Sequence, residues 1–276
     1  MKEPVKPLLK IDFKPDVFFW NKPPGHRKFT WAGDTLTLPP GTELRRYRVD
    51  EGLALFKSFA ELPSREAAIL DFANTHGPLT ANLAFCPLSF WRDHIRLMRQ
   101  MVDLRYALKE FDWKGIRENL QPFHTFDTPN ARAIKEKLRK GNRLTDEELI
   151  EAAVMRLLYP ATQAERNLIP EVVFDAAKKT VGLRLRHASL LDYMWHQLSR
   201  AVVENVELKS CQVCGSSFDP RRYRDDHRIC SDRCRYRLYQ DRIASAKEMR
   251  AKGKTPRQIA KELSAELTHV KKWIAT

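Results

Sequence analysis

The chain has 276 residues, 43% of them hydrophobic, which is enough for one large domain or two to three smaller ones with buried cores. No apolar run approaches the roughly 18 residues that a membrane-spanning helix needs, and the N-terminus has no apolar signal core. These features exclude an integral membrane protein, and we expect a cytoplasmic one.

The formal net charge of +14 favours a polyanionic partner, although a merely soluble basic surface would give the same total. The charge is concentrated near the C-terminus. Residues 209–276 contain 17 Lys and Arg against 8 Asp and Glu, a net charge of +9, which leaves +5 for the longer remainder. This distribution favours a nucleic-acid partner for the last quarter of the chain.

Residues 1–50 are rich in proline and aromatic residues. Short β-type runs occur at 18–20, 28–31 and 35–38, and Pro-Pro-Gly at 23–25 and 39–41 separates them. We expect a β-rich irregular arm that packs on the following domain.

From residue 51 the apolar residues follow a helical spacing. Ser64 is a candidate N-cap for a helix that ends near Gly77. The strongest predicted helix covers residues 89–111 and should be central to the core, because two adjacent apolar stripes give it a wide hydrophobic face. The stripes are Leu97, Met101, Leu104, Leu108 and Phe111, and Trp91, Ile95, Met98 and Val102.

Thr145 and Glu148 form a predicted capping box that opens a helix through about Leu158. Residues 171–174 and 180–186 are typical of the two strands of a hairpin, and Ser189 caps a further helix. Residues 51–206 therefore predict one mainly helical domain with a small β-sheet. The fold class expected for the whole chain is mainly α (α+β).

Four of the five cysteines occur in two close pairs within residues 207–242, a predicted zinc-finger module. The pairs are Cys211 with Cys214 and Cys230 with Cys234, separated by a 15-residue spacer. A Cys-x-x-Cys turn followed by Gly215 can present two thiolates to one ion, and the second pair has the spacing of one helical turn. The Cys-x-x-Cys-Gly turn, or knuckle, followed by a β-hairpin and a helix predicts a treble-clef finger.

Four thiolates fill the tetrahedral coordination of Zn²⁺ and leave no position for water, so one structural zinc ion is expected. The alternatives are a disulfide pair, which a reducing compartment opposes, and a redox switch that releases zinc. His227 could replace a cysteine as ligand. A position on the surface, or next to a ligand without binding the metal, suits it better.

Arginines crowd the finger, with tyrosines Tyr223, Tyr236 and Tyr239 among them. The guanidinium fork suits phosphate oxygens, so we expect nucleic-acid contacts from these arginines, although a solvated face or an acidic protein partner would use the same residues. The arginines are Arg221, Arg222, Arg224, Arg228, Arg233, Arg235, Arg237 and Arg242.

Residues 243–276 predict a helix-turn-helix. A first helix ends near Ala251, Thr255 caps a second, and a turn at 264–266 leads into a third helix with Val270 and Trp273. Ser264 occupies a turn position where glycine is common. The residues expected to face a major groove are Thr268, His269, Lys271 and Lys272. The alternative is a plain helical hairpin.

Across residues 51–242, the chain resembles the bacterial CGNR zinc-finger regulators with an ABATE-type N-terminal domain. The resemblance rests on the finger, on residues 72–77 (Phe-Ala-Asn-Thr-His-Gly) and on residues 189–195 (Ser-Leu-Leu-Asp-Tyr-Met-Trp). It implies stress-linked transcription regulation with zinc on Cys211, Cys214, Cys230 and Cys234. The chain departs from the family in having Arg-Tyr-Arg after Cys234, where the family has Gly-Asn-Arg, and in adding the helix-turn-helix.

The leading hypothesis is a transcription regulator that binds double-stranded DNA and is not an enzyme. A homodimer is compatible with the helix-turn-helix. An RNA-associated zinc-binding module is the alternative, because arginine and tyrosine together also suit single strands. A nuclease or defence effector is the third hypothesis, although the sequence contains no matching catalytic motif.

Overall fold

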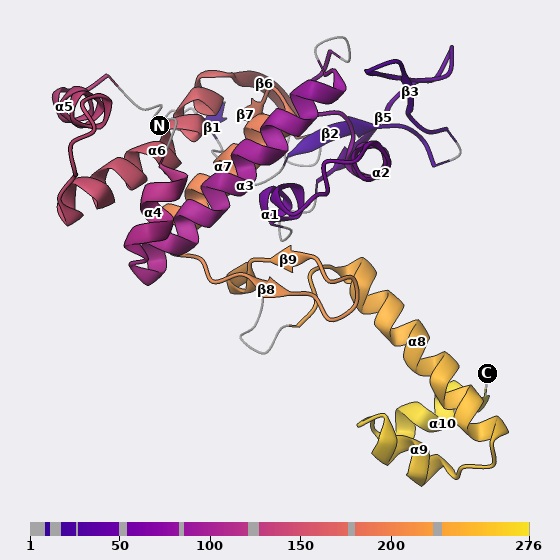
Figure 1. Ribbon diagram of the computed structural model, residues 1–276. Coiled ribbons are helices and arrows are strands. Elements are labelled where there is room, and N and C mark those ends of the chain that lie inside the picture. Colours follow the sequence, from indigo (N-terminus) through magenta and orange to yellow (C-terminus); the bar gives the residue numbers. More distant parts are fainter. Residues whose placement is uncertain are drawn as a thin grey trace, which may run out of the picture. The chain divides into compact units, whose positions relative to one another are not determined.

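The computed structural model describes residues 9–11, 18–25, 27–49, 54–82, 86–120, 127–175, 180–222 and 228–275. They belong to two compact units, unit 1 (Met1–Glu207) and unit 2 (Leu208–Thr276) (Figure 1). The described chain is mainly helical with small β-sheets, which confirms the expected fold class. No helix among these residues is long and apolar enough to cross a membrane.

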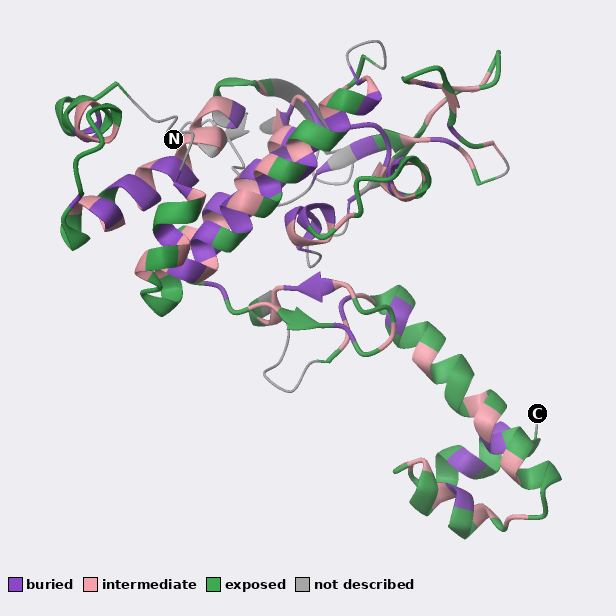
Figure 2. Ribbon diagram, viewed as in Figure 1, coloured by how far each residue is buried: buried purple, intermediate pink, exposed green. Residues whose placement is uncertain are grey.

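Unit 1 has its core around a long central helix. This helix, α3, packs against α1, α4 and α6, and α7 packs against α1 and α6. Buried positions recur along α3 and α7 (Figure 2). The helices are α1 (Leu55–Ala60), α2 (Glu66–His76), α3 (Leu88–Glu110), α4 (Trp113–Asn119), α5 (Pro129–Arg139), α6 (Asp146–Arg166) and α7 (Leu190–Val203).

Most of the wide apolar face predicted for α3 is buried, two of its leucines are half-buried, and its last residue is exposed. Trp91, Ile95 and Met98 are fully buried, as the central role of the helix requires. Phe111 was expected on the same face but is 61% exposed. Phe111 is the C-cap of α3. Its left-handed φ of 54° ends the helical backbone, so its side chain does not continue the apolar stripe.

Helix ends were predicted well where they depend on neighbouring residues. Thr145 and Glu148 form the predicted capping box, with N–H···O distances of 3.0 and 3.2 Å. Ser189 caps α7 as predicted. Ser64, however, is not the N-cap of α2, because the helix starts one residue later and Arg65 occupies that position without a side-chain cap.

The helix α6 continues beyond the predicted end near Leu158 and contains Pro160. Proline removes one backbone donor, which usually ends or kinks a helix. Here the Thr162 hydroxyl lies 3.0 Å from the carbonyl oxygens of both Leu158 and Tyr159, and α6 packs along α7. This tertiary packing offsets the lost bond.

The described residues of unit 1 also form three small sheets. The strand β7 (Thr180–His187) lies between antiparallel β6 (Leu168–Asp175) and parallel β1 (Leu9–Ile11). In the N-terminal arm, β2 (Phe19–Lys22) pairs with β5 (Arg45–Arg48), and β3 (Thr30–Ala32) pairs with β4 (Thr35–Thr37). The arm packs on the helices, since β2 contacts α2 and the Phe29 N–H donates to Asn74 Oδ1 at 2.7 Å.

Unit 2 contains a short hairpin and three helices. The elements are β8 (Lys209–Ser210), β9 (Ser217–Phe218), the 3₁₀ turn η2 (Pro220–Arg222), α8 (Asp232–Ala251), α9 (Pro256–Glu262) and α10 (Leu267–Ala275). The predicted boundary between the finger and the C-terminal module falls at residue 242, whereas α8 runs unbroken across that position. No glycine or proline interrupts residues 232–251, and the first break is Gly253 with φ 83°.

Candidate metal centre and basic surface

The four paired cysteines lie close enough together to hold one metal ion. Their Sγ atoms are all within 4.8 Å of one another. The Cys214–Cys230 and Cys230–Cys234 sulfur separations are both 3.6 Å. A tetrahedral ion with metal–sulfur bonds of about 2.3 Å needs sulfurs about 3.8 Å apart. All four cysteines are free thiols, so their geometry fits a site for a single metal ion and not a disulfide.

The first pair is positioned by the β8–β9 hairpin. Cys211 and Cys214 lie in the turn between the strands, where the Gly215 N–H donates to the Cys211 carbonyl at 2.8 Å. Gly215 has φ 74°, the left-handed conformation that the sequence predicted for this position. Phe218 of β9 is fully buried.

The second pair brackets the start of α8. The one-turn spacing predicted both cysteines on a helix, which is wrong for Cys230, because this residue precedes the N-cap Ser231. Ser231 accepts a hydrogen bond from the Cys234 N–H at 3.3 Å, which holds Cys234 in the first turn. The Cys230 N–H points to Cys211 Sγ at 3.4 Å and joins the two pairs.

The pKa shifts of three of the thiols follow from their burial and their neighbours. Burial raises the pKa of Cys230 and Cys234. Burial also acts to raise the pKa of Cys211, but backbone N–H donors outweigh it and lower this pKa to about 6. Four thiolates so close together would repel one another, and a divalent cation would compensate their charge.

The arginines predicted to bind nucleic acid are exposed wherever the structure describes their side chains. Arg221 forms a two-point pair with Asp219, at 2.8 and 3.0 Å, and Arg235 pairs with Asp232 at 2.8 Å, so both are partly neutralised. The exposed arginines are Arg221, Arg228, Arg233, Arg235, Arg237 and Arg242. The Arg222 side chain, Arg224, Tyr223 and His227 lie outside the described residues.

Three of these arginines surround one hollow. It has a volume of about 350 Å³ and lies between the knuckle and α8. Arg228 comes from the segment before Cys230, while Arg235, Tyr239 and Arg242 recur at helical spacing along α8. Gln212 and Leu238 also line it, and no pattern in the sequence singled them out.

The last three helices pack around a small apolar cluster of Ala246, Ile259, Val270 and Trp273. Thr255 caps α9, as predicted, and the structure adds a capping box with Gln258. The turn contains Ser264 with φ 46°, a conformation that favours glycine. The four residues predicted to face a major groove, Thr268, His269, Lys271 and Lys272, are all exposed on α10.

Aromatic contacts connect the hollow to α10. Tyr239, at the hollow, packs edge-on against Trp273, with ring centroids 5.9 Å apart. His269 stacks on the same indole at 6.1 Å. The arginine-lined hollow and the exposed residues of α10 are therefore parts of one packed unit.

No protein family, curated protein or solved structure matches this chain.

Proposed function

We propose that this chain is a DNA-binding transcription regulator in which unit 2 holds one structural Zn²⁺ and binds duplex DNA. The observation that carries the proposal is the shared helix α8. It begins at the metal centre with Cys234 and reaches the helical cluster with Ala246. The two residues are about 18 Å apart along the helix axis, so one rigid element joins the arginines to α10.

Zinc is the proposed ion because four sulfur donors in a tetrahedral set suit it well. With all four positions taken by protein thiolates, no site remains for a metal-bound water. This supports a structural role for the ion and not a catalytic one.

The proposed phosphate contacts come from the arginine-lined hollow. Arg228, Arg235 and Arg242 offer planar donor forks that match phosphate oxygens. Residues 209–276 carry +9 of the total +14, which supports long-range attraction of a polyanion.

We assign α9, its turn and α10 as the helix-turn-helix, with α10 as the recognition helix. Thr268, His269, Lys271 and Lys272 would read base edges and nearby phosphates in the major groove. Proteins of this type usually bind two half-sites as dimers, so we propose a homodimer on a two-fold operator. The residues shared with the CGNR regulators support a proposed relationship to that family.

The test is binding of random duplex DNA by fluorescence anisotropy across a salt series, for the full chain and for a chain ending at Glu207. We expect a steep salt dependence for the full chain only, because log affinity falls by roughly 0.9 per neutralised phosphate for each unit of log salt. Circular dichroism checks that the shorter chain remains helical. Negligible binding by the full chain at low salt would refute the proposal.

A second candidate is binding of single-stranded RNA. Tyr236 and Tyr239 are 66% and 48% exposed on α8, and exposed aromatic rings beside arginines can stack on unpaired bases. Competition between a duplex and a single strand of equal length separates the two functions, and preference for the single strand would favour RNA.

A further inference from the structure

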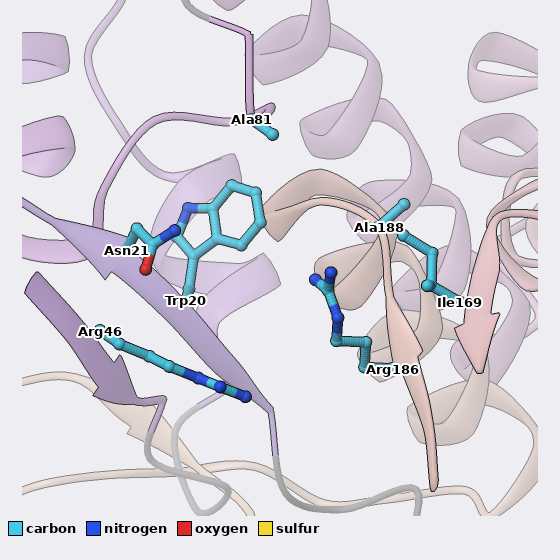
Figure 3. A pocket seen from close by; sticks show the side chains of 7 residues that line it. All are labelled: Trp20, Asn21, Arg46, Ala81, Ile169, Arg186 and Ala188. Atoms are coloured by element: carbon cyan, nitrogen blue, oxygen red, sulfur yellow. The ribbon is translucent and has the colours of Figure 1, made fainter. Parts of the chain in front are cut away.

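A hollow of about 290 Å³ opens in unit 1 between two of its sheets (Figure 3). Asn21 and Arg46 occupy paired positions on β2 and β5. Ile169 and Arg186 occupy paired positions on β6 and β7. Each sheet therefore contributes one arginine to the wall of the same hollow.

Trp20 forms a fixed apolar wall. The side chain is only 4% exposed, and its indole N–H donates to the Pro78 carbonyl at 2.8 Å. The ring stacks on Phe18 with centroids 5.7 Å apart. Gly77 adopts φ 92° beside it, and a Cβ there would lie 2.8 Å from the indole, so the backbone fits closely against the ring. The wall is preformed and does not need a ligand to order it.

The described lining of the hollow carries positively charged side chains. Its described wall contains Arg46 and Arg186 and no Asp or Glu. The Arg186 guanidinium is directed into the space beside the Trp20 ring (Figure 3). Arg186 makes no hydrogen bond or ion pair with the part of the chain that the structure describes. A guanidinium placed this way can bind an oxyanion without first breaking an internal pair.

We propose that this hollow binds a small organic anion. Its carboxylate or phosphate pairs with Arg186 and Arg46, and its apolar body lies against Trp20 and Ile169. The volume is at the lower end of the roughly 300–1,000 Å³ common for ligand sites, which limits the body to about one ring. This site lies within unit 1 and does not rest on nucleic-acid binding by unit 2.

The first experiment is calorimetric titration of the full chain with benzoate, phenyl phosphate and the neutral analogue benzyl alcohol. We expect saturable one-site binding of at least one anion and at least about 10-fold weaker binding of the alcohol, because the alcohol lacks the charge that the arginine fork recognises. Preference between the two anions identifies the oxyanion. Absence of saturable binding for both anions up to about 10 mM would overturn the proposal.

Variants locate the bound anion. Arg186→Gln is expected to weaken binding at least about 10-fold. Arg96→Gln makes the same charge change on an exposed residue of α3 outside the hollow and should leave the affinity unchanged. Equal affinity in the two variants would place the anion elsewhere, for example on the basic surface of unit 2, and would also overturn the proposal.

Arg46→Gln provides an independent variant if Arg186→Gln fails to fold, and the same loss is expected because both arginines line the hollow. Arg186→Lys keeps the charge but removes the fork, so intermediate affinity is expected. DNA binding by each variant is measured separately. Loss of anion binding with intact DNA binding separates this proposal from the proposed function.

Discussion

His187 is a buried titratable side chain in the core of unit 1. It is 4% exposed and lies among the rings of Phe18, Tyr193 and His196, with centroids 6.0, 5.6 and 4.9 Å away. Burial and the neighbouring His196 lower its pKa to about 3. Its Nδ1 has no hydrogen-bond partner among the residues that the structure describes. The folded protein therefore holds this imidazole neutral.

This lowered pKa predicts acid sensitivity of unit 1. The unfolded chain binds a proton below pH about 6.5 and the folded chain does not, so stability is present above that pH and is lost as the pH falls toward 3. We expect His187 to account for about 2 kcal/mol of unfolding free energy lost between pH 7 and pH 5. Urea titrations of the wild type and of His187→Phe at both pH values measure this loss of unfolding free energy. His269→Phe, at an exposed histidine, is the control. Equal losses of unfolding free energy in the wild type and in His187→Phe would contradict the assignment to His187.

Ser264 is a second residue whose conformation leads to a prediction. Its φ of 46° costs a non-glycine residue on the order of 1 kcal/mol. We expect Ser264→Gly to stabilise the α9–α10 turn by about that amount, which slows amide exchange in these helices about fivefold. Gly253→Ala, at φ 83°, should have the opposite effect. Amide hydrogen exchange measured by mass spectrometry tests both variants. Faster exchange in Ser264→Gly than in the wild type would refute the strain argument.

At the scale of elements, α8 depends on different interactions at its two ends. The N-terminal turn is held by Cys234 and the Ser231 cap, while the C-terminal half is held by Ala246 in the apolar cluster. Between these two residues α8 has no buried side chain (Figure 2). Metal loss should therefore affect only one end of the helix.

Chelation tests this division. We expect removal of the metal to unfold residues 209–222 and 228–231 and the first turn of α8, because metal binding supplies on the order of 10 kcal/mol to folding in zinc-finger peptides. Exchange protection should persist in α3, α7 and α10. Cys214→Ser should mimic chelation, whereas the buried Cys86→Ser should retain the metal, since Cys86 is not in the sulfur cluster. Unchanged protection at residues 209–222 and 228–231 after chelation would contradict a structural metal.

The elements also show what could be predicted from the sequence. The Ser189 and Thr255 caps and the Gly215 turn depend on residues close in the chain, and all three were predicted. The continuation of α6 through Pro160 depends on packing against α7, which no local pattern contains. The hollow beside Trp20 is also non-local, since Arg46 and Arg186 are 140 residues apart in sequence and meet only through two separate sheets.

At the scale of the whole molecule, the two units differ in charge and in the size of their cores. Residues 209–276 carry a net +9, and the described apolar cluster of their three helices has four buried members. Unit 1 contains the extended core around α3 and α7. If nucleic-acid binding is electrostatic, its salt dependence should follow unit 2 alone.

The sharpest test of this partition compares two triple variants of the full chain. Arg228→Gln, Arg235→Gln and Arg242→Gln together remove the arginines of the unit 2 hollow. The control removes three exposed charges of unit 1 by the same change at Arg96, Arg132 and Arg139.

If each unit 2 arginine neutralises one phosphate, the slope of log affinity against log salt should become shallower by up to about 2.7, at 0.9 per contact. The control slope should equal that of the wild type. Because Arg235 already pairs with Asp232, a reduction nearer to about 1.8 would mean that this arginine stays with its carboxylate when DNA binds. An equal reduction in both variants would show that binding depends on overall charge and not on the hollow.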